Sequence, residues 1–274
     1  MSQNDKDNDS EDGRPLAIVT GGGTGVGAAT ALMLAARGYD VVVNYSRSSA
    51  AAEAVAGRCR DAGVAIQADV ADDAACRGIA DFAADRRGRI DTLVNSAGTT
   101  RFVGITDLEA QKVEDFQEVF AVNTLGPFQM ARAAAPYLRR SPVASVVNVS
   151  SIAGQVGNGS SMAYIASKGA LNSLTLALAR SLAPDVRVNA VAPGMISGRW
   201  FREGAGEEAY DRARTAFAAN AALGTVSTPE DVAQAVVFLV DGCSTVTGQI
   251  LPVDAGVLLG PAPNLASDAD KDDD

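Results

Sequence analysis

The strongest constraint on the fold of this chain is a short apolar run that passes directly into a glycine-rich turn. Residues 16–20 read LAIVT, and residues 20–27 read TGGGTGVG. An alanine-rich segment from Ala28 to Arg37 follows and ends at Gly38. In a strand, glycine turn and helix of this kind, backbone N–H groups and the positive end of the helix face a pyrophosphate. The sequence therefore predicts a dinucleotide-binding βα unit near the start of the chain.

Short β-rich runs alternate with alanine-rich helical segments along the rest of the sequence. A second strand is expected over 40–45 and a second helix over 50–63. Further strands are expected over 65–70, 92–98, 144–151, 187–194 and 248–256. Strands that are almost continuously apolar suit a sheet covered on both faces, and their alternation with helices indicates parallel βαβ units. We therefore expect one doubly wound, Rossmann-like α/β domain over residues 14–260.

The charge of the chain is concentrated at its two ends. Residues 1–13 and 261–274 each carry five acids and one lysine, which leaves −2 of the total −10 for the rest. Acidic runs without an apolar pattern are typical of disordered tails. A basic stripe is missing, so no nucleic-acid partner is expected. Apolar runs are far shorter than the ~18 residues of a membrane span. Without an apolar leader, a cytoplasmic location is the default expectation.

The complete lack of histidine narrows the chemistry. It excludes Ser-His-Asp and Cys-His nucleophilic mechanisms, histidine general bases and HExxH metal sites. The three cysteines form no CxxC pair, and no metal site is expected. Proton transfer in an enzyme of this composition must use tyrosine, lysine, a carboxylate or a cofactor.

Several motifs, taken in order along the chain, resemble the short-chain dehydrogenase/reductase family and its 3-oxoacyl-(acyl-carrier-protein) reductase-like group. They are the family's TGxxxGxG pattern at Gly21, Gly25 and Gly27, NSAG at 95–98 in place of NNAG, Asn123 in VNTLG, a Ser…YxxxK set at Ser151, Tyr164 and Lys168, and PG at 193–194. The resemblance covers about residues 15 to 256. It implies a seven-stranded, mainly parallel sheet of order 3-2-1-4-5-6-7 with helices on both faces, and a homotetramer.

The resemblance also implies a catalytic set of Asn123, Ser151, Tyr164 and Lys168. Tyr164 and Lys168 stand at i and i+4, so they share one face of a helix. A lysine ammonium one turn away is expected to lower the phenol pKa from its usual value of about 10. Tyr164 would then be the general acid in carbonyl reduction, or the general base in alcohol oxidation.

The resemblance assigns three supporting roles. Lys168 also binds the nicotinamide ribose, Ser151 holds the substrate carbonyl oxygen, and Asn123 holds a water that relays protons to Lys168. Ser150 competes with Ser151 for the second role, and the spacing to Tyr164 favours Ser151.

A dinucleotide is expected along the carboxyl ends of the strands. The residues assigned to it are Gly21, Thr24, Gly25, Val26, Gly27, Tyr45, Ser46, Arg47, Asp69, Val70, Asn95, Ala97, Gly98, Tyr164, Lys168, Pro193, Gly194 and Ile196. The second strand ends without a carboxylate, and Arg47 follows it closely. Arginine suits the 2′-phosphate of NADP, so NADP is favoured over NAD. Asp69 either contacts the adenine or caps the next helix, and both readings stay open.

The sequence departs from the family where the substrate lid is expected, at about residues 195–220. Gly198 stands in the usual place of a threonine that touches the nicotinamide carboxamide, and Ser197 precedes it. Trp200 and Phe201 follow. They either line an apolar pocket or pack the lid shut, and the sequence does not separate these two readings.

The leading hypothesis is an NADPH-dependent reductase of a ketone or aldehyde. One alternative is an NAD-dependent sugar, polyol or other alcohol dehydrogenase. A second alternative, from another class, is a dinucleotide-sensing or scaffold protein without turnover. The substrate itself is outside the reach of these motifs, because specificity depends on the lid and loops.

Overall fold

The computed structural model of the protein describes residues 13–59 and 63–260. Within them, seven strands form one sheet of order β3-β2-β1-β4-β5-β6-β7, and every neighbouring pair is parallel. The strands are β1 Leu16–Thr20, β2 Asp40–Tyr45, β3 Val64–Gln67, β4 Thr92–Asn95, β5 Ser145–Val149, β6 Arg187–Pro193 and β7 Ile250–Val253. The predicted fold and strand order are confirmed, and the sheet is parallel throughout.

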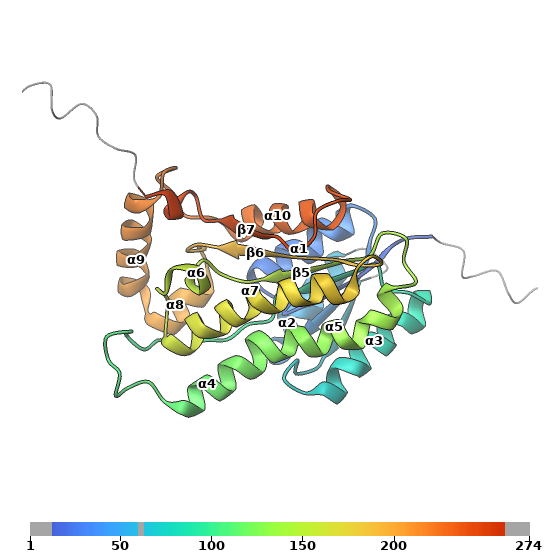
Figure 1. Cartoon of the computed structure of the whole chain (residues 1–274), viewed down its shortest axis with the longest axis horizontal. Helices are drawn as coiled ribbons and strands as arrows, with labels where there is room; N and C mark the ends of the chain where they lie inside the picture. The colour runs from blue at the N-terminus through green and yellow to red at the C-terminus, as the bar shows by residue number, and fades with distance from the viewer. Residues whose placement is uncertain (1–12, 60–62, 261–274) are drawn as a thin grey trace, which may run out of the picture.

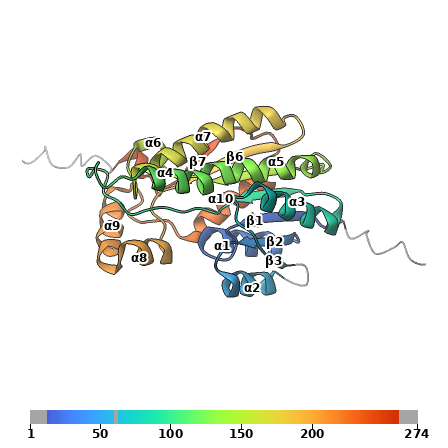
Figure 2. The ribbon, with the colours of Figure 1, turned by 90° about the horizontal axis from the view of Figure 1, so that it is seen from below.

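Helices cover the sheet in two layers, as Figure 2 shows. One layer holds α1 Gly25–Ala36, α2 Ser49–Arg58 and α10 Pro229–Asp241, and the other holds α3 Asp73–Arg87, α5 Gly126–Leu138 and α7 Met162–Leu182. A separate apolar core fills each interface between sheet and helices. Strand β1 is buried along its whole length, because both faces of its LAIVT sequence meet helices.

The remaining elements gather near the carboxyl ends of the strands (Figure 1). They are α4 Val113–Phe120, the π-helical turn η2 Ala121–Leu125, α6 Ala153–Val156, α8 Arg199–Ala205, α9 Glu207–Asn220 and the 3₁₀ turn η3 Val257–Leu259. Ligands of open α/β sheets bind at this edge, so these elements surround the place where the site is expected.

Several element ends differ from the sequence-based expectation. Strand β4 stops at Asn95 rather than at residue 98, because the N–H groups of Ser96 and Ala97 donate to Thr20 Oγ1, each at 3.1 Å, and leave the ladder. Helix α1 begins at Gly25 rather than at Ala28. Helix α2 ends at Arg58, and residues 60–62 of the predicted helix lie outside the described residues.

Strand β7 is shorter than the predicted 248–256. Gly248 and Gly256 adopt φ values of 71° and 82°, which extended strands do not contain. The other outer strand, β3, ends at Gln67, where the chain turns toward α3.

Three backbone segments meet closely behind the carboxyl end of β1. A Cβ atom on Gly27 would overlap the carbonyl oxygen of Gly21. A Cβ atom on Gly21 would lie 2.8 Å from the Cα of Ala97. The first turn of α1 and the segment after β4 can therefore approach the end of β1 only because residues 21 and 27 are glycines.

The predicted acidic tails, residues 1–13 and 261–274, lie outside the described residues except for Gly13, and the domain bounds stay a prediction. Among the described helices, none is both long and apolar enough to cross a bilayer.

We predict that Gly27→Ala lowers the free energy of unfolding by about 1–3 kcal/mol or more, because the added methyl meets fixed backbone. Chemical denaturation measures this change. Gly57→Ala in α2 is the control, since a Cβ there meets nothing within 4 Å and should be neutral or slightly stabilising. Equal stability of the two variants would contradict the role of this contact.

Candidate active site

The four residues predicted to be catalytic come together at the carboxyl edge of the sheet. Ser151 follows β5, Asn123 lies on η2, and Tyr164 and Lys168 lie on the first turns of α7. Helix α7 starts where it does because Ser161 caps it, with its hydroxyl accepting the Tyr164 N–H at 3.2 Å. This cap fixes the tyrosine and the lysine against the end of β5.

The hydroxyl of Ser151 lies beside the phenol of Tyr164 and acts to lower the pKa of that phenol. Its Oγ also accepts the N–H of Ala153 at 3.1 Å and lies 3.4 Å from the carbonyl oxygen of Pro193. The competing Ser150 is buried and donates instead to Asn172 Oδ1 at 2.6 Å. The geometry therefore favours Ser151 as the hydroxyl that stands beside Tyr164.

Lys168 is almost completely buried, with 4% of its surface exposed. Its Nζ donates to the carbonyl oxygen of Val149 at 2.8 Å and lies 5.7 Å from the centre of the Tyr164 ring. The two side chains thus share one face of α7, as their spacing predicts. Gly98 packs next to this ammonium, because a Cβ at that position would lie 4.0 Å from Lys168 Nζ.

The expected effect of Lys168 on Tyr164 is not seen in the structure. Burial raises the pKa of Tyr164 to about 12, and the neighbouring hydroxyl of Ser151 only partly opposes this shift. Burial also lowers the pKa of Lys168 to about 8. Both shifts favour the neutral forms, because desolvation disfavours charge on either group. Desolvation therefore outweighs the attraction that the spacing alone suggests.

Asn123 is held rigidly by a widened helical turn. Its side chain accepts the Thr99 N–H at 2.8 Å and donates to the Thr99 carbonyl at 2.9 Å and to Ser167 Oγ at 3.0 Å. Pro127 lacks the N–H that would bond to the Asn123 carbonyl in an α-helix. The backbone instead forms a π turn in which Gly126 N–H donates to Ala121 O. This turn joins the segment after β4 to α7.

The glycine turn offers a cradle that fits the pyrophosphate of a dinucleotide. Gly25 has φ 52°, and a Cβ built there would meet no atom within 4 Å, so the space in front of it is open. The first turn of α1, which includes Val26 after the cap residue Thr24, contains no acidic residue. No carboxylate of the helix itself therefore neutralises the positive end of its dipole, which suits the binding of an anion.

The predicted adenosine-side residues occupy the ends of β2 and β3. Tyr45 is the last residue of β2, Ser46 and Arg47 are exposed, and Arg47 forms no ion pair with the described part of the chain. Asp69 is exposed and accepts the Ala71 N–H at 3.0 Å. Helix α3 is capped by Asp72 instead, so the capping alternative for Asp69 is wrong.

Two of the predicted cofactor residues, Val70 and Asn95, have side chains that point away from the expected cofactor site. The Val70 side chain is buried and packs against Gly126. The Asn95 amide points into the sheet, where it donates to Asn148 Oδ1 at 2.9 Å. These two residues could meet a cofactor only through their backbone.

The backbone segments that flank the site are well positioned for close approach. Ala97 lies against Gly21, and the Pro193 carbonyl accepts the Ile152 N–H at 3.0 Å. Gly194 N–H donates to Val253 O at 3.1 Å, and Ile196 forms a β-bridge with Ser227.

The predicted lid, residues 195–220, contains α8 and α9. Trp200 packs against Tyr164, with ring centres 5.9 Å apart, while 51% of the tryptophan stays exposed. A hollow of about 460 Å³ lies here, lined by residues that include Thr99, Phe102 and Trp200. Trp200 therefore both lines a pocket and packs on the site. Thr99 and Phe102 were not among the predicted site residues, because no motif marks them, although both lie within four residues after the NSAG segment.

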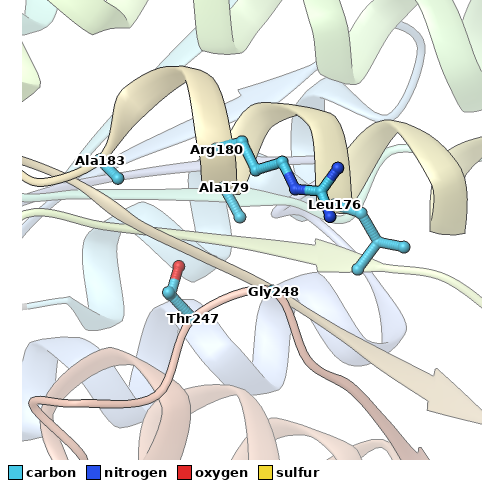
Figure 3. Close-up of a pocket in the computed structure, with 6 residues that line it drawn as sticks. All are labelled: Leu176, Ala179, Arg180, Ala183, Thr247 and Gly248. Atoms are coloured by element: carbon cyan, nitrogen blue, oxygen red, sulfur yellow. The ribbon is translucent and has the colours of Figure 1, made fainter.

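A second hollow, shown in Figure 3, lies away from these residues. Leu176, Ala179 and Arg180 of α7, together with Ala183 directly after its end, face Thr247 and Gly248 before β7. It lies about 18 Å along α7 from Tyr164, at 1.5 Å per residue. None of the predicted site residues lines it. Elsewhere in the described residues, no cluster of three or more His, Cys, Asp or Glu side chains could hold a metal.

Comparison with known proteins agrees with this geometry. The family model described as enoyl-(acyl carrier protein) reductase matches residues 21–258. A ketoacyl reductase assigned to the granaticin polyketide synthase of Streptomyces violaceoruber is 42% identical over 245 residues, which cover 89% of this chain and 96% of that protein. A crystal structure assigned to the short-chain dehydrogenase/reductases, from Burkholderia xenovorans, is 42% identical with a TM-score of 0.83, covering 91% of this chain and all of that one. The chain belongs to the short-chain dehydrogenase/reductase family.

This short-chain dehydrogenase/reductase is an NAD(P)-dependent oxidoreductase that acts on carbonyl or CH–OH groups. A 3-oxoacyl-(acyl-carrier-protein) reductase from Synechocystis sp. is also similar, at 36% identity over 250 residues, which cover 89% of this chain and 97% of that protein. The family membership excludes the alternative of a scaffold protein without turnover. It leaves the substrate and the choice between NADP and NAD undecided.

From the low pKa of Lys168 we predict how the free energy of unfolding depends on pH. The unfolded chain keeps this proton up to its ordinary value of 10.5, whereas the folded chain releases it at about 8. The wild type should therefore gain stability as pH rises through that window, by up to about 3 kcal/mol.

Lys168→Met should lose this gain, which chemical denaturation of the cofactor-free protein at about pH 7 and about pH 9.5 would measure. Lys112→Met is the control, because Lys112 is exposed. If the stability of Lys168→Met followed that of the wild type across this pH range, Lys168 would not be a desolvated lysine.

Proposed function

We propose that the protein reduces a ketone with NADPH, in the manner of a 3-oxoacyl reductase. The observation that carries this proposal is the placement of the Ser151 hydroxyl beside the phenol of Tyr164, next to a buried Lys168. The similar proteins from Streptomyces violaceoruber and Synechocystis sp. are named as reductases of ketoacyl and 3-oxoacyl groups, which supports the same substrate class here.

Tyr164 and Ser151 would act together on the substrate carbonyl. A bound NADPH would supply a hydride to the carbonyl carbon and leave as NADP⁺. As negative charge develops on the carbonyl oxygen, Ser151 donates a hydrogen bond to it and Tyr164 transfers its phenolic proton to it. The products are an alcohol and a phenolate that must recover its proton.

The raised pKa of Tyr164 suits the reductive direction. A phenol with a pKa of about 12 is fully protonated at neutral pH, which is the form that a proton donor needs. An alcohol oxidation would instead require the phenolate. The ammonium of Lys168, with a pKa of about 8, is the stronger acid of the pair, so proton transfer toward the Tyr164 phenolate is downhill. We assign Asn123 to the same proton path, because it lies between Thr99 and Ser167 next to Lys168.

Tyr164→Phe tests the proton donor. It should lower kcat for reduction of a 3-oxoacyl ester by about 10²–10⁴-fold, because the proton donor is lost while the ring that contacts Trp200 stays. The rate is followed by NADPH absorbance, and the dissociation constant of NADPH should stay nearly unchanged. The control is Tyr137→Phe, which removes a hydroxyl bonded to Asp81 far from the site. Normal turnover in Tyr164→Phe would refute the mechanism.

NADP is the proposed cofactor form. The described residues at the end of β2 present no carboxylate to a ribose hydroxyl, and the exposed guanidinium of Arg47 forms no ion pair with them. A 2′-phosphate could accept a bidentate pair of hydrogen bonds from this side chain. Ser46 lies next to it on the same turn and adds a hydroxyl.

The cofactor choice has a direct test. Arg47→Ala should weaken NADPH binding about tenfold or more, the effect of one lost charge-assisted hydrogen bond, and should leave NADH binding nearly unchanged. Equilibrium titration of each nucleotide measures both constants. Arg58→Ala is the matched control, since Arg58 is also exposed and lies at the end of α2. Equal losses for the two nucleotides would argue against NADP specificity.

A homotetramer and a cytoplasmic location stay predictions from the resemblance and the composition. Exposed apolar side chains on two faces support self-association. Leu125 and Phe128 project from η2 and α5, and Phe238 and Leu251 from α10 and β7. Two such surfaces are what an assembly of more than two copies requires.

A further inference from the structure

Helix α8, in the predicted lid, contacts a loop earlier in the chain through the ring of Phe102, which packs against Gly204. Phe102 lies in the loop between β4 and α4, and its ring packs against Phe201 with centres 5.3 Å apart and against Trp200 at 6.2 Å. A Cβ atom on Gly204 would overlap the Phe102 ring. The ring therefore occupies a notch on α8 that exists only because residue 204 has no side chain.

This contact links the lid to the proposed proton donor. Trp200 and Gly204 stand at i and i+4, so they share one face of α8. The same Trp200 ring lies 5.9 Å from the ring of Tyr164. Because Gly204 and Trp200 belong to the same short helix, a displacement of Gly204 away from Phe102 would also displace Trp200 relative to Tyr164.

Phe102 is the fixed partner in this arrangement. Its neighbour Val103 donates its N–H to the Ser160 carbonyl at 2.8 Å, and Thr100 Oγ1 lies 2.6 Å from Ser160 Oγ. Ser160 directly precedes the cap of α7. Helix α8, in contrast, buries none of its residues. The loop is therefore tied to the helix that carries Tyr164. Helix α8 rests on this loop and on the buried Tyr210 of α9, which contacts Phe201 and Arg202.

The charged groups at this hollow are already paired. Arg101 forms ion pairs with Asp115 and Glu118, and Glu203 pairs with Arg199. What the hollow offers to a substrate is therefore aromatic surface and threonine hydroxyls rather than an unpaired charge. Such a wall suits an uncharged, apolar group.

We propose that Phe102 and Gly204 form a specificity-determining pair that places Trp200 against the apolar substituent beside the substrate carbonyl. The inference rests on the proposed function, since it takes Tyr164 as the proton donor to that carbonyl. It selects uncharged ketones with a bulky apolar or aromatic substituent over ketones with a small one.

Four proteins test the pair: the wild type, Gly204→Ala, Phe102→Ala and the double variant. Two matched 3-oxo esters serve as probes, ethyl benzoylacetate with a phenyl group on the ketone and ethyl acetoacetate with a methyl group. We expect the wild type to prefer the phenyl ester. Gly204→Ala should lower kcat/KM for the phenyl ester about tenfold and affect the methyl ester less.

The double variant distinguishes a local clash from a general defect. Without the Phe102 ring, an alanine at residue 204 meets no obstacle there, so the double variant should match Phe102→Ala rather than the product of both losses. Gly78→Ala is the control, because Gly78 is an exposed helical glycine with open space around it. Thermal unfolding confirms that each variant is folded.

Fluorescence gives a readout independent of turnover, since Trp200 is the single tryptophan of the chain. Acrylamide should quench Gly204→Ala more strongly than the wild type, and the double variant should match Phe102→Ala. Unchanged quenching and an unchanged ester preference in Gly204→Ala, or fully additive losses in the double variant, would overturn the inference. If the wild type reduced neither ester with NADPH or NADH, the proposed function would fail, and quenching alone would decide the coupling between Phe102 and Gly204.

Discussion

The close approach of three backbone segments at the end of β1 is the contact on which the rest of the site depends. Gly27 brings the first turn of α1 against Gly21, and Gly21 brings the end of β1 against Ala97. Thr20 fastens the same junction by accepting the Ser96 and Ala97 N–H groups. From Ala97 the chain leads directly to Gly98, beside Asn123 and Lys168. The proposed cofactor cradle and the proposed proton-transfer groups therefore lie on two sides of one packed joint.

Desolvation determines the protonation states at the other side of this joint. The same low-dielectric surroundings raise the pKa of Tyr164, which keeps the phenol protonated, and lower the pKa of Lys168, which makes its ammonium a stronger acid. An arrangement that only stabilised the ion pair would leave the phenol without its proton and would suit alcohol oxidation better. In the proposed reaction, the protonated phenol is the form of Tyr164 that carbonyl reduction requires.

The sequence was sufficient for the strand order and for the residues that meet at the site, because motifs at fixed places in a βα series imply one topology. It was insufficient where contacts between distant parts of the chain change the length of a strand or the pKa of a side chain from what the neighbouring residues suggest. Strand β4 ends early because Thr20, far away in the chain, takes its next N–H groups. The effect of burial on Tyr164 exceeds what the spacing to Lys168 suggests. The role of Phe102 could not be predicted from sequence, because it depends on a contact with Gly204, about a hundred residues later in the chain.

The π turn around Asn123 limits which insertions and deletions the helical segment from Val113 to Leu138 can accept during evolution. A π turn accommodates one extra residue, which rotates everything before it by about 100° relative to everything after it. This rotation lets α4 lie along α7 while α5 lies along α3. Insertions and deletions are usually tolerated in loops, but here a single-residue change would turn one half of the helix away from its neighbour. The length of this segment is therefore expected to be among the most restricted properties of the chain.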